Sequence, residues 1–292
     1  MQLLQFDGPL DETLVDPVLL VALDGWTDAG RCGSLAGEAL RQQWHAQRLG
    51  TFPSDGLYDY RDRRPLLTID RGLLADPVWP SLDVYQLAPP GGGEAVLIQG
   101  GEPDFQWQQL TRDIVDLAEL LQARRYLGLG AVPAPVPHTR VTPILTTGSD
   151  EAMLDRYGRP HEHLTVPASC QVIVESALRD AGVTTLGLWA RIPHYAAGEY
   201  PAGAHALLRH VAEMLGAELD LSDLLRDAEA HRQRLDIAAN SSDDVLAHIR
   251  QLEQAYDQDV TEDSGFGPLP SGDEIAAELE RFLRHQGGPD QS

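Results

Sequence analysis

Apolar runs of strand length alternate with amphipathic helical segments along most of the chain. The continuous run from Val18 to Leu23 leads into a helical segment over 27–48, and the run from Ala95 to Gln99 leads into one over 104–124. Strands that are apolar throughout, rather than at every second position, are typical of sheets covered on both faces. The repeated strand–helix pairing therefore predicts βαβ units and a mostly parallel sheet.

The same alternation continues beyond these two units, and shorter apolar segments lie between them. Four further elements are expected, as a strand over 126–132, a helix over 168–181, a strand over 185–192 and a helix over 204–215. Pro and Gly residues interrupt the region between the first two units, and such breakers limit the length of any strand. Short strands are expected in this region over 57–60, 66–69 and 82–87.

The composition changes after Gly216. Residues 218–292 contain 18 Asp or Glu and 6 Arg, so −12 of the net charge of −23 lies in this last quarter. Apolar side chains recur there at helical spacing, and no strand pattern remains. Helices are expected around 221–228, 245–256 and 275–283, with an acidic connector over 257–272. The sequence thus predicts an α/β core domain, 1–217, and an acidic helical C-terminal extension, 218–292.

Charge and residue usage exclude several classes of function. A net charge of −23 disfavours nucleic acid and membrane as partners, because both are bound through Lys and Arg patches. All 22 basic residues are Arg, which excludes a P-loop lysine and a Schiff base. Cys32 and Cys170 are the only cysteines, which indicates a reducing compartment. With no signal-peptide pattern and no apolar run of about 20 residues, we expect a cytoplasmic protein.

Four polar segments follow expected strands, at the sheet edge where α/β proteins usually bind ligands. The first runs from Gly25 to Gly30 and contains Trp26, Thr27 and Asp28 between a strand and a helix. Its helix N–H groups could form an anion site. Alternatively, Thr27 or Asp28 caps the helix while the glycines allow close packing.

The other three segments offer candidate acids, bases and anion ligands. Glu102 could act as a general acid or base, or lie in the first turn of a helix, where the dipole favours it. His138 and Arg140, in a proline-rich loop, could grip a carboxylate or phosphate, or hold the loop by hydrogen bonds. His194 could be a base, or could form an aromatic surface for a subunit contact together with Tyr195.

The sequence contains no motif that is typical of a metal or cofactor site. His161-Glu162-His163 contains the one close histidine pair, and it does not match the H-E-x-x-H spacing of zinc sites. The glycine spacing after the first strand is not that of a dinucleotide fingerprint. We therefore expect no metal and no cofactor.

Taken together and in order, these segments resemble landmarks of the proteasome assembly chaperone 2 family, in its actinobacterial branch. Gly25-Trp26-Thr27-Asp28-Ala29-Gly30 is similar to the family's Gly-Trp-Asn-Asp-Ala-Gly signature, with Thr27 in place of Asn. The further matching segments are Gly101-Glu102-Pro103 with Trp107, the loop 137–140, Pro193-His194-Tyr195, and 269–275 running into 280–283, which resembles the branch's C-terminal helix.

The resemblance implies a three-layer α/β/α fold with a mostly parallel or mixed sheet, similar to purine nucleoside phosphorylases and hydrolases. It also implies a homo-oligomer, with a trimer favoured, and a role in assembling or regulating the proteasome core particle. In the eukaryotic relatives a C-terminal hydrophobic-Tyr-any tail enters pockets of the proteasome α ring. The sequence ends Gly287 to Ser292 without such a tail, so we do not expect that docking mode.

Two hypotheses for the function follow, and we favour the first. The first is a non-enzymatic, self-associating protein, with the partner-binding candidates Trp26, Thr27, Asp28, Glu102, His138, Arg140, His194 and Tyr195. The second is a small-molecule enzyme of hydrolase or phosphorylase type, with its site at the carboxyl edge of the strands. Its catalytic candidates are Asp28, Glu102, His138, Arg140 and His194.

Overall fold

The computed structural model describes residues 1–10, 14, 16–160 and 163–261. The strands are β1 (Gln5–Phe6), β2 (Val18–Asp24), β3 (Gln47–Phe52), β4 (Ile69–Asp70), β5 (Leu73–Leu74), β6 (Leu82–Leu87), β7 (Ala95–Gly101), β8 (Arg125–Ala134), β9 (Ile144–Gly148) and β10 (Thr184–Pro193). The helices are the 3-10 turn η1 (Ala29–Arg31), α1 (Cys32–Gln43), α2 (Trp107–Leu120), α3 (Glu151–Tyr157), α4 (Cys170–Asp180), α5 (Pro201–Leu215), α6 (Ser222–Ala239) and α7 (Asp243–Thr261).

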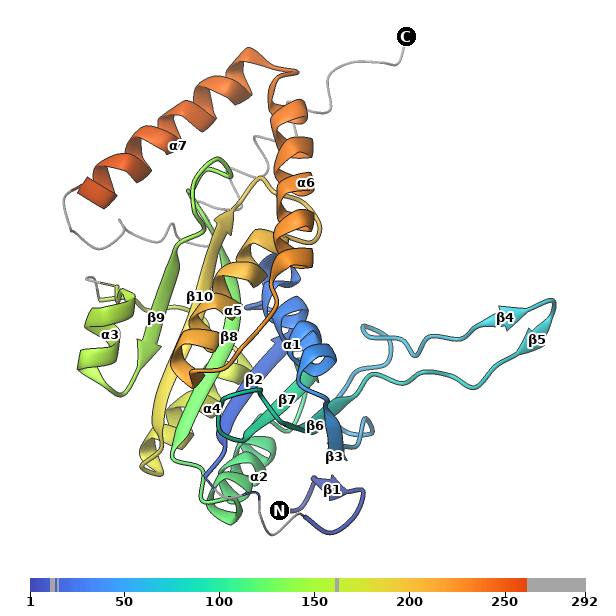
Figure 1. The fold of residues 1–292 in the computed structure, drawn as a ribbon. Coiled ribbons are helices and arrows are strands. Elements are labelled where there is room, and N and C mark those ends of the chain that lie inside the picture. The colour runs from blue at the N-terminus through green and yellow to red at the C-terminus, as the bar shows by residue number, and fades with distance from the viewer. Residues whose placement is uncertain (11–13, 15, 161–162, 262–292) are drawn as a thin grey trace.

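Eight of the strands form one mixed sheet in the order β1-β3-β6-β7-β2-β8-β10-β9 (Figure 1). The central strands β7, β2, β8 and β10 are parallel to one another. The strands β6, β3 and β1 on one side and β9 on the other each pair antiparallel with their inner neighbour. Helices α1 and α5 pack on one face, and α2 and α4 pack on the other. The predicted α/β fold with helices on both faces of a mixed sheet is confirmed.

Strand β2 is buried on both faces, which explains its unbroken apolar run. Leu20 packs with Leu40 of α1 in one core cluster. Its neighbour Leu19 packs with Leu117 of α2 in the other cluster. All four leucines are 0% exposed, and burying a leucine contributes about 1.5–3 kcal/mol to folding. Because successive side chains of a strand alternate between faces, two cores require apolar residues at every position.

Two of the elements predicted for the first 60 residues differ from the structure. Residues 57–60, expected as a strand, form turns in which the Leu57 N–H donates to the Ser54 carbonyl at 3.0 Å. The expected helix over 27–48 is shortened to α1, and strand β3, which lies between β1 and β6, begins at Gln47. The first two residues of β3 are exposed, so this outer strand lacks the continuous apolar run of the central strands.

The C-terminal region is helical. Leu224 and Leu235 of α6 pack at the border of the core cluster that contains α1 and α5. Helix α7 runs through 257–261, which the sequence assigned to a connector. The helix expected over 275–283 lies outside the described residues, and the domain division after residue 217 stays a prediction. None of the helices in the described part of the chain is long and apolar enough to cross a membrane.

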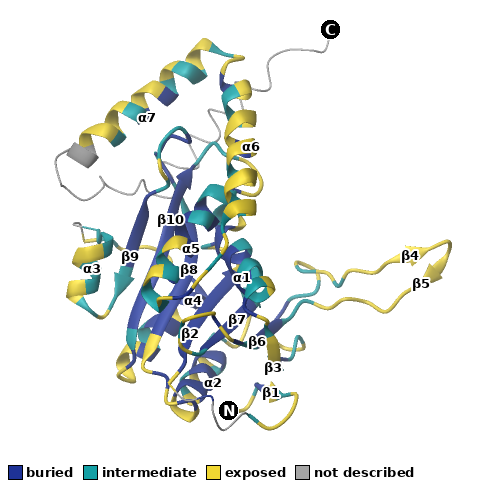
Figure 2. Cartoon of the chain, viewed as in Figure 1, coloured by how far each residue is buried: buried dark blue, intermediate teal, exposed yellow. Residues whose placement is uncertain are grey.

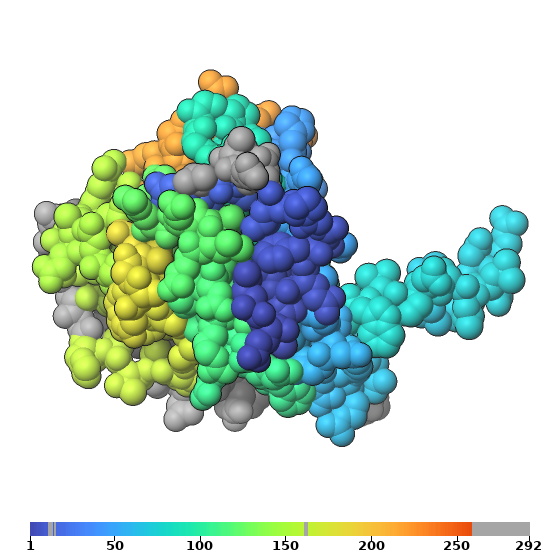
Figure 3. Space-filling view, turned by 90° about the horizontal axis from the view of Figure 1, so that it is seen from below, coloured from blue at the N-terminus to red at the C-terminus, as the bar shows by residue number. Residues whose placement is uncertain are grey.

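Residues 64–80 form an arm that projects from the α/β body (Figures 1 and 3). Strands β4 and β5 pair antiparallel at its tip, and both turn residues, Arg71 and Gly72, have positive φ, as tight hairpins require. The strand expected over 66–69 is wrong: this segment lies in the arm, where Leu66 forms an isolated bridge with Val78 and only Ile69 belongs to a strand, β4. Most of the arm is exposed (Figure 2). Its exposed large apolar side chains are Leu66, Leu67, Ile69, Leu73, Leu74, Val78 and Trp79.

Candidate functional site

The four polar segments lie at the carboxyl edge of β2, β7, β8 and β10, as the parallel direction of these strands requires. Helices α6 and α7 lie over the part of this edge formed by β8 and β10 (Figure 1). The structure places the candidate residues in two groups. Asp28 and Glu102 lie beside the starts of α1 and α4, whereas His138, Arg140 and their neighbours contact α6 and α7.

Asp28 is a buried carboxylate that binds the first turn of α1. It accepts hydrogen bonds from the Gly33 N–H at 2.6 Å and from the Ser34 N–H and hydroxyl at 3.3 and 2.5 Å. The N–H groups of a first helical turn have no partner within the helix, so a carboxylate there satisfies them. Burial raises the pKa of Asp28, and the hydrogen bonds from Ser34 and Gly33 oppose that rise.

Two glycines of this segment allow a close approach of backbones. Gly30 has a φ of 61°, and a Cβ built on it would lie 2.6 Å from the Cβ of Tyr200. A Cβ on Gly33 would lie 2.5 Å from the carbonyl oxygen of Leu129 in β8. Both approaches are too close for any side chain. The glycines thus let the start of α1 pack against β8 and against the residue before α5.

Glu102 joins two loops at the carboxyl edge. Its carboxylate accepts hydrogen bonds from the Trp26 N–H at 2.9 Å and from the N–H of Cys170, the first residue of α4, at 2.7 Å. Its own N–H donates to the Asp24 carbonyl at 2.9 Å. The helix that follows begins only at Trp107, so Glu102 lies at the start of α4 and not in the first turn of α2.

Trp26 and Thr27 lie in the turn held by these carboxylates. The Trp26 side chain is exposed, with 68% of its residue surface open to solvent, whereas the Thr27 carbonyl accepts a hydrogen bond from the Ala131 N–H at 2.7 Å. Arg63, which the sequence did not indicate, donates to the Asp24 carbonyl at 3.0 Å. No local pattern marks Arg63, because it comes from an irregular segment before the arm.

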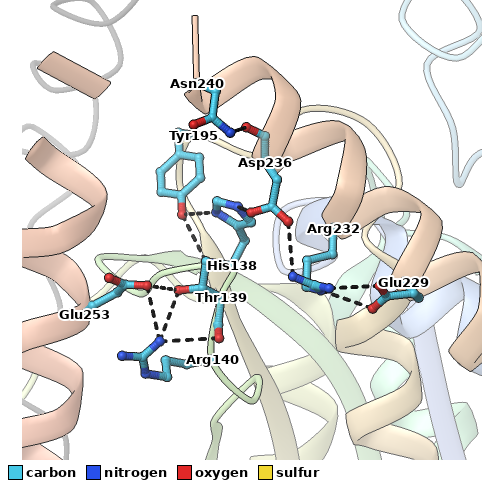
Figure 4. A network of polar contacts seen from close by, with 9 residues as sticks. All are labelled: His138, Thr139, Arg140, Tyr195, Glu229, Arg232, Asp236, Asn240 and Glu253. Atoms are coloured by element: carbon cyan, nitrogen blue, oxygen red, sulfur yellow. Dashed lines mark hydrogen bonds and ion pairs between the residues drawn. The ribbon is translucent and has the colours of Figure 1, made fainter. Parts of the chain in front are cut away.

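His138 is buried and hydrogen-bonded on both ring nitrogens. Its Nδ1 lies 2.8 Å from the hydroxyl of Tyr195, and its Nε2 lies 3.2 Å from Oδ1 of Asp236 on α6 (Figure 4). The backbone N–H of His138 donates to the same hydroxyl at 2.9 Å. Burial raises the pKa of Tyr195, so the phenol keeps its proton. The hydroxyl therefore donates to Nδ1, and Nε2–H donates to Asp236.

Arg140 joins the same loop to α7. Its Nε and Nη2 donate to the two carboxylate oxygens of Asp257 at 2.8 and 2.7 Å, and its Nη1 donates to Glu253 at 3.2 Å. The Thr139 hydroxyl donates to the same oxygen of Glu253 at 2.5 Å (Figure 4). The hydrogen bonds with Asp257 raise the pKa of Arg140 and lower that of Asp257. The carboxylates that Arg140 binds in this structure thus belong to helix α7 of the same chain.

His194 extends this contact from the loop after β10. Its Nδ1 lies 3.3 Å from the Ala134 carbonyl oxygen. Its ring meets the rings of Tyr195 and of His248 on α7 edge-on, with centroids 5.4 and 5.7 Å apart. The loops after β8 and β10 together form the surface on which α6 and α7 pack.

A cavity of about 260 Å³ lies between α5, α6 and the loop after β8. Its basic lining residues are His138, Arg140, His205, Arg209, His231 and Arg232. Among the described lining residues Glu229 is the one acid, and it accepts a hydrogen bond from Arg232 at 2.8 Å. The sequence did not indicate this cavity, because its walls come from helices that meet only in the folded chain. The one local signal is that His205 and Arg209, four residues apart, share a helix face.

The described part of the chain contains no group of side chains suited to metal binding or to thiol chemistry. Among the residues that the structure describes, no three His, Cys, Asp or Glu side chains are placed to hold a metal ion. Cys32 and Cys170 are buried, and burial raises the pKa of both thiols, that of Cys170 to about 12. Both thiols are therefore protonated at neutral pH and are poor nucleophiles.

The chain belongs to the PAC2 family, whose sequence model matches residues 22–239. This match confirms the resemblance seen in the sequence motifs. The matched region begins in β2 and ends at the last residue of α6, so it includes the four polar segments and the cavity between α5 and α6. No curated protein matches the sequence.

Three solved structures illustrate the relationship. A protein of unknown function from Corynebacterium glutamicum is 28% identical, with a TM-score of 0.83, over 88% of this chain and 98% of that one. The Mycobacterium tuberculosis protein Rv2714, also of unknown function, is 30% identical, with a TM-score of 0.82, over 89% and 90%. The Mycobacterium tuberculosis proteasome-assembly chaperone homologue Rv2125 is 27% identical, with a TM-score of 0.74, over 80% and 99%.

Proposed function

We propose that this protein is a non-enzymatic, self-associating factor that assembles or regulates the proteasome core particle in the cytoplasm. The observation that carries the proposal is its likeness, over 80% of the chain, to a protein described as a proteasome-assembly chaperone homologue. Membership of the PAC2 family over 22–239 supports the same role. The family resemblance makes a trimer the oligomer that we favour.

The arm supports self-association. A two-stranded hairpin is at best marginally stable in water, and this one exposes leucines such as Leu73 and Leu74 at 75% and 70%. Exposed apolar surface of this kind is typical of a protein interface. In a closed cyclic oligomer each arm can lie against the next subunit, so that the apolar surface of every arm is covered.

Hydrogen bonding at the carboxyl edge favours the non-enzymatic role over a hydrolase or phosphorylase-like enzyme. A general base needs an acceptor that can reach the substrate. Instead, Asp28 binds the first turn of α1, and Glu102 binds two backbone N–H groups. His138 is engaged on both ring nitrogens, and Arg140 pairs with α7. These side chains hold the chain's own loops and helices together.

Among the predicted partner-binding residues, Trp26 is the best placed to contact another protein. Its side chain is largely exposed, while the backbone beneath it is fixed by the hydrogen bond to Glu102. Large aromatic side chains on a rigid support often dominate the binding energy of protein interfaces. We therefore assign Trp26 to the contact with the proteasome subunits.

Native mass spectrometry tests the proposal, first with the protein alone and then with proteasome α and β subunits from the same cell. We expect a homo-oligomer that captures those subunits, and a Trp26→Ala variant that keeps the oligomer but captures them at least about tenfold more weakly. A protein that ignores the subunits would refute the proteasome role. A monomer at micromolar concentration would refute self-association.

A pair of matched variants tests the arm. Leu73→Ser with Leu74→Ser removes apolar surface from the arm, and Leu120→Ser with Ile237→Ser removes exposed apolar surface elsewhere. We expect the first double variant to be monomeric and the second to keep the mass of the wild-type oligomer. An arm variant with the wild-type mass would show that the arm is not the subunit contact.

A further inference from the structure

We propose that the cavity between α5, α6 and the loop after β8 binds a small organic anion, with an oxyanion head group on a short apolar body. The proposal does not depend on the proteasome role, because it rests on the cavity's own residues. Its basis is the contrast between the basic side chains that already have acidic partners and those that do not.

Three basic side chains of the lining are already satisfied within the chain. His138 is hydrogen-bonded to Tyr195 and Asp236, and Arg140 pairs with α7. Arg232 pairs with Glu229 at 2.8 Å and with Asp236 at 3.0 Å (Figure 4). These residues build the wall of the cavity and offer little uncompensated charge.

The other three basic side chains, His205, Arg209 and His231, have no hydrogen-bond or ion-pair partner among the described residues. His205 and Arg209 lie one helical turn apart on α5, so they share a face, and His231 approaches from α6. Unpaired cationic or N–H donors that converge from two helices are the arrangement that recognises a carboxylate or phosphate. The protein carries a net charge of −23, so three neighbouring basic side chains without an acidic partner depart from its general composition.

The environment of His231 is the strongest single observation in favour of an anion site. The residue is only 8% exposed, and its ring packs edge-on against Tyr200 with centroids 5.5 Å apart. Neither ring nitrogen has a hydrogen-bond partner among the described residues, and neither is among the fully enclosed atoms, so the ring is accessible from the cavity that it lines. An oxyanion in the cavity would accept a hydrogen bond from its N–H group.

The local electrostatics support an anion. Burial lowers the pKa of His205, and the neighbouring Arg209 lowers it further. Burial also lowers the pKa of His231, with further contributions from Arg234 and His138. Both imidazoles are therefore neutral near pH 7 and each offers one N–H donor, while Arg209 carries the positive charge. An oxyanion can accept hydrogen bonds from these N–H groups and pair with Arg209.

The rest of the lining sets the size and polarity of the ligand. The volume of about 260 Å³ is below the usual range for sites that hold drug-sized molecules, so the ligand is small. The apolar side chains of the lining favour a ligand with an apolar body, and the basic side chains favour an anionic head group. The apolar lining residues are Val141, Ala202, Ala206, Leu225, Ala228 and Leu235.

Isothermal titration calorimetry of the full chain tests the ligand class with defined probes. We expect hexanoate and hexyl phosphate to bind, with the tighter of the two identifying the head group. Hexanol, hexylamine and inorganic phosphate should bind at least about tenfold more weakly, because each lacks the charge or the apolar body. Hexanol that binds as tightly as hexanoate would refute anion recognition. Inorganic phosphate that binds as tightly as hexyl phosphate would refute the apolar part.

Three variants test the place of binding. Arg209→Gln should weaken hexanoate or hexyl phosphate about tenfold, which is the usual effect of losing one charged hydrogen bond. Arg112→Gln, on the opposite face at α2, removes the same charge and should leave binding unchanged. Ala228→Phe fills the cavity without changing charge and should abolish binding. Equal effects of the two arginine variants, or binding to Ala228→Phe, would overturn the proposal.

Discussion

The buried residue Glu175 offers a direct test of how burial changes the pKa of a carboxyl group in this fold. The residue is on α4 and is only 5% exposed, and its carboxylate lies against Thr147 of β9 and Gly187 of β10. The Thr147 hydroxyl donates to its carboxylate at 2.9 and 3.0 Å, and the Trp189 indole N–H donates to Thr147 at 2.9 Å. Burial raises the pKa of Glu175 from its ordinary value of 4.5 to about 7, although the Thr147 hydrogen bond and the charge of Arg179 oppose the rise.

The raised pKa predicts how stability depends on pH. The folded state binds the proton of Glu175 more tightly than the unfolded state does, so the contribution is fully present below pH 4.5. It is lost as pH rises from 4.5 to about 7 and stays lost above that value. Each tenfold change in an acid constant corresponds to about 1.4 kcal/mol, so the loss is about 3 kcal/mol.

Glu175→Gln removes this titration and keeps an acceptor for Thr147. We expect the variant to be slightly less stable than the wild type near pH 4, because the second amide donor lacks a partner at every pH. It should be more stable at pH 8.5 by about 2–3 kcal/mol, because only the wild type has lost the contribution of Glu175 there. Urea unfolding at fixed protein concentration, at several pH values between 4 and 8.5, measures the difference.

Glu119→Gln, on the exposed end of α2, is the matched control and should follow the wild-type curve at every pH. The reasoning requires the difference between Glu175→Gln and the wild type to grow between pH 4.5 and 7. A difference that is constant with pH would refute it, as would a variant less stable than the wild type at pH 8.5.

Two further predictions concern carboxylates that bind backbone N–H groups. Asp28→Ala leaves the first turn of α1 without its acceptor, so we expect about 1–2 kcal/mol lower stability in urea unfolding; an unchanged midpoint would show that water replaces the carboxylate. Asp113 accepts from the N–H groups of three N-terminal residues, and Asp113→Ala should speed hydrogen exchange over 2–4 while the centre of the sheet stays protected. Unchanged exchange over 2–4 would mean that packing, and not Asp113, holds the segment.

The candidate site shows how far sequence reasoning reaches. The partner of Asp28 lies six residues away, so the helix-binding role of this carboxylate was one of the alternatives open from the sequence. Glu102 meets Cys170 at a separation of 68 residues, and His138 meets Asp236 at 98. Nothing in the local sequence indicates such pairs, because they exist only once sheet order and helix packing bring their elements together.

The alternation of strands and helices, and the change to acidic helices after Gly216, could be predicted from the amino-acid sequence. These features depend on side-chain periodicity within a few residues, which fixes the buried face of each element. Three features became visible only in the folded chain: the antiparallel outer strands, the projection of the arm, and the packing of α6 on α5 beside His205 and His231. Those features depend on long-range packing, in which many weak contacts between distant segments act together.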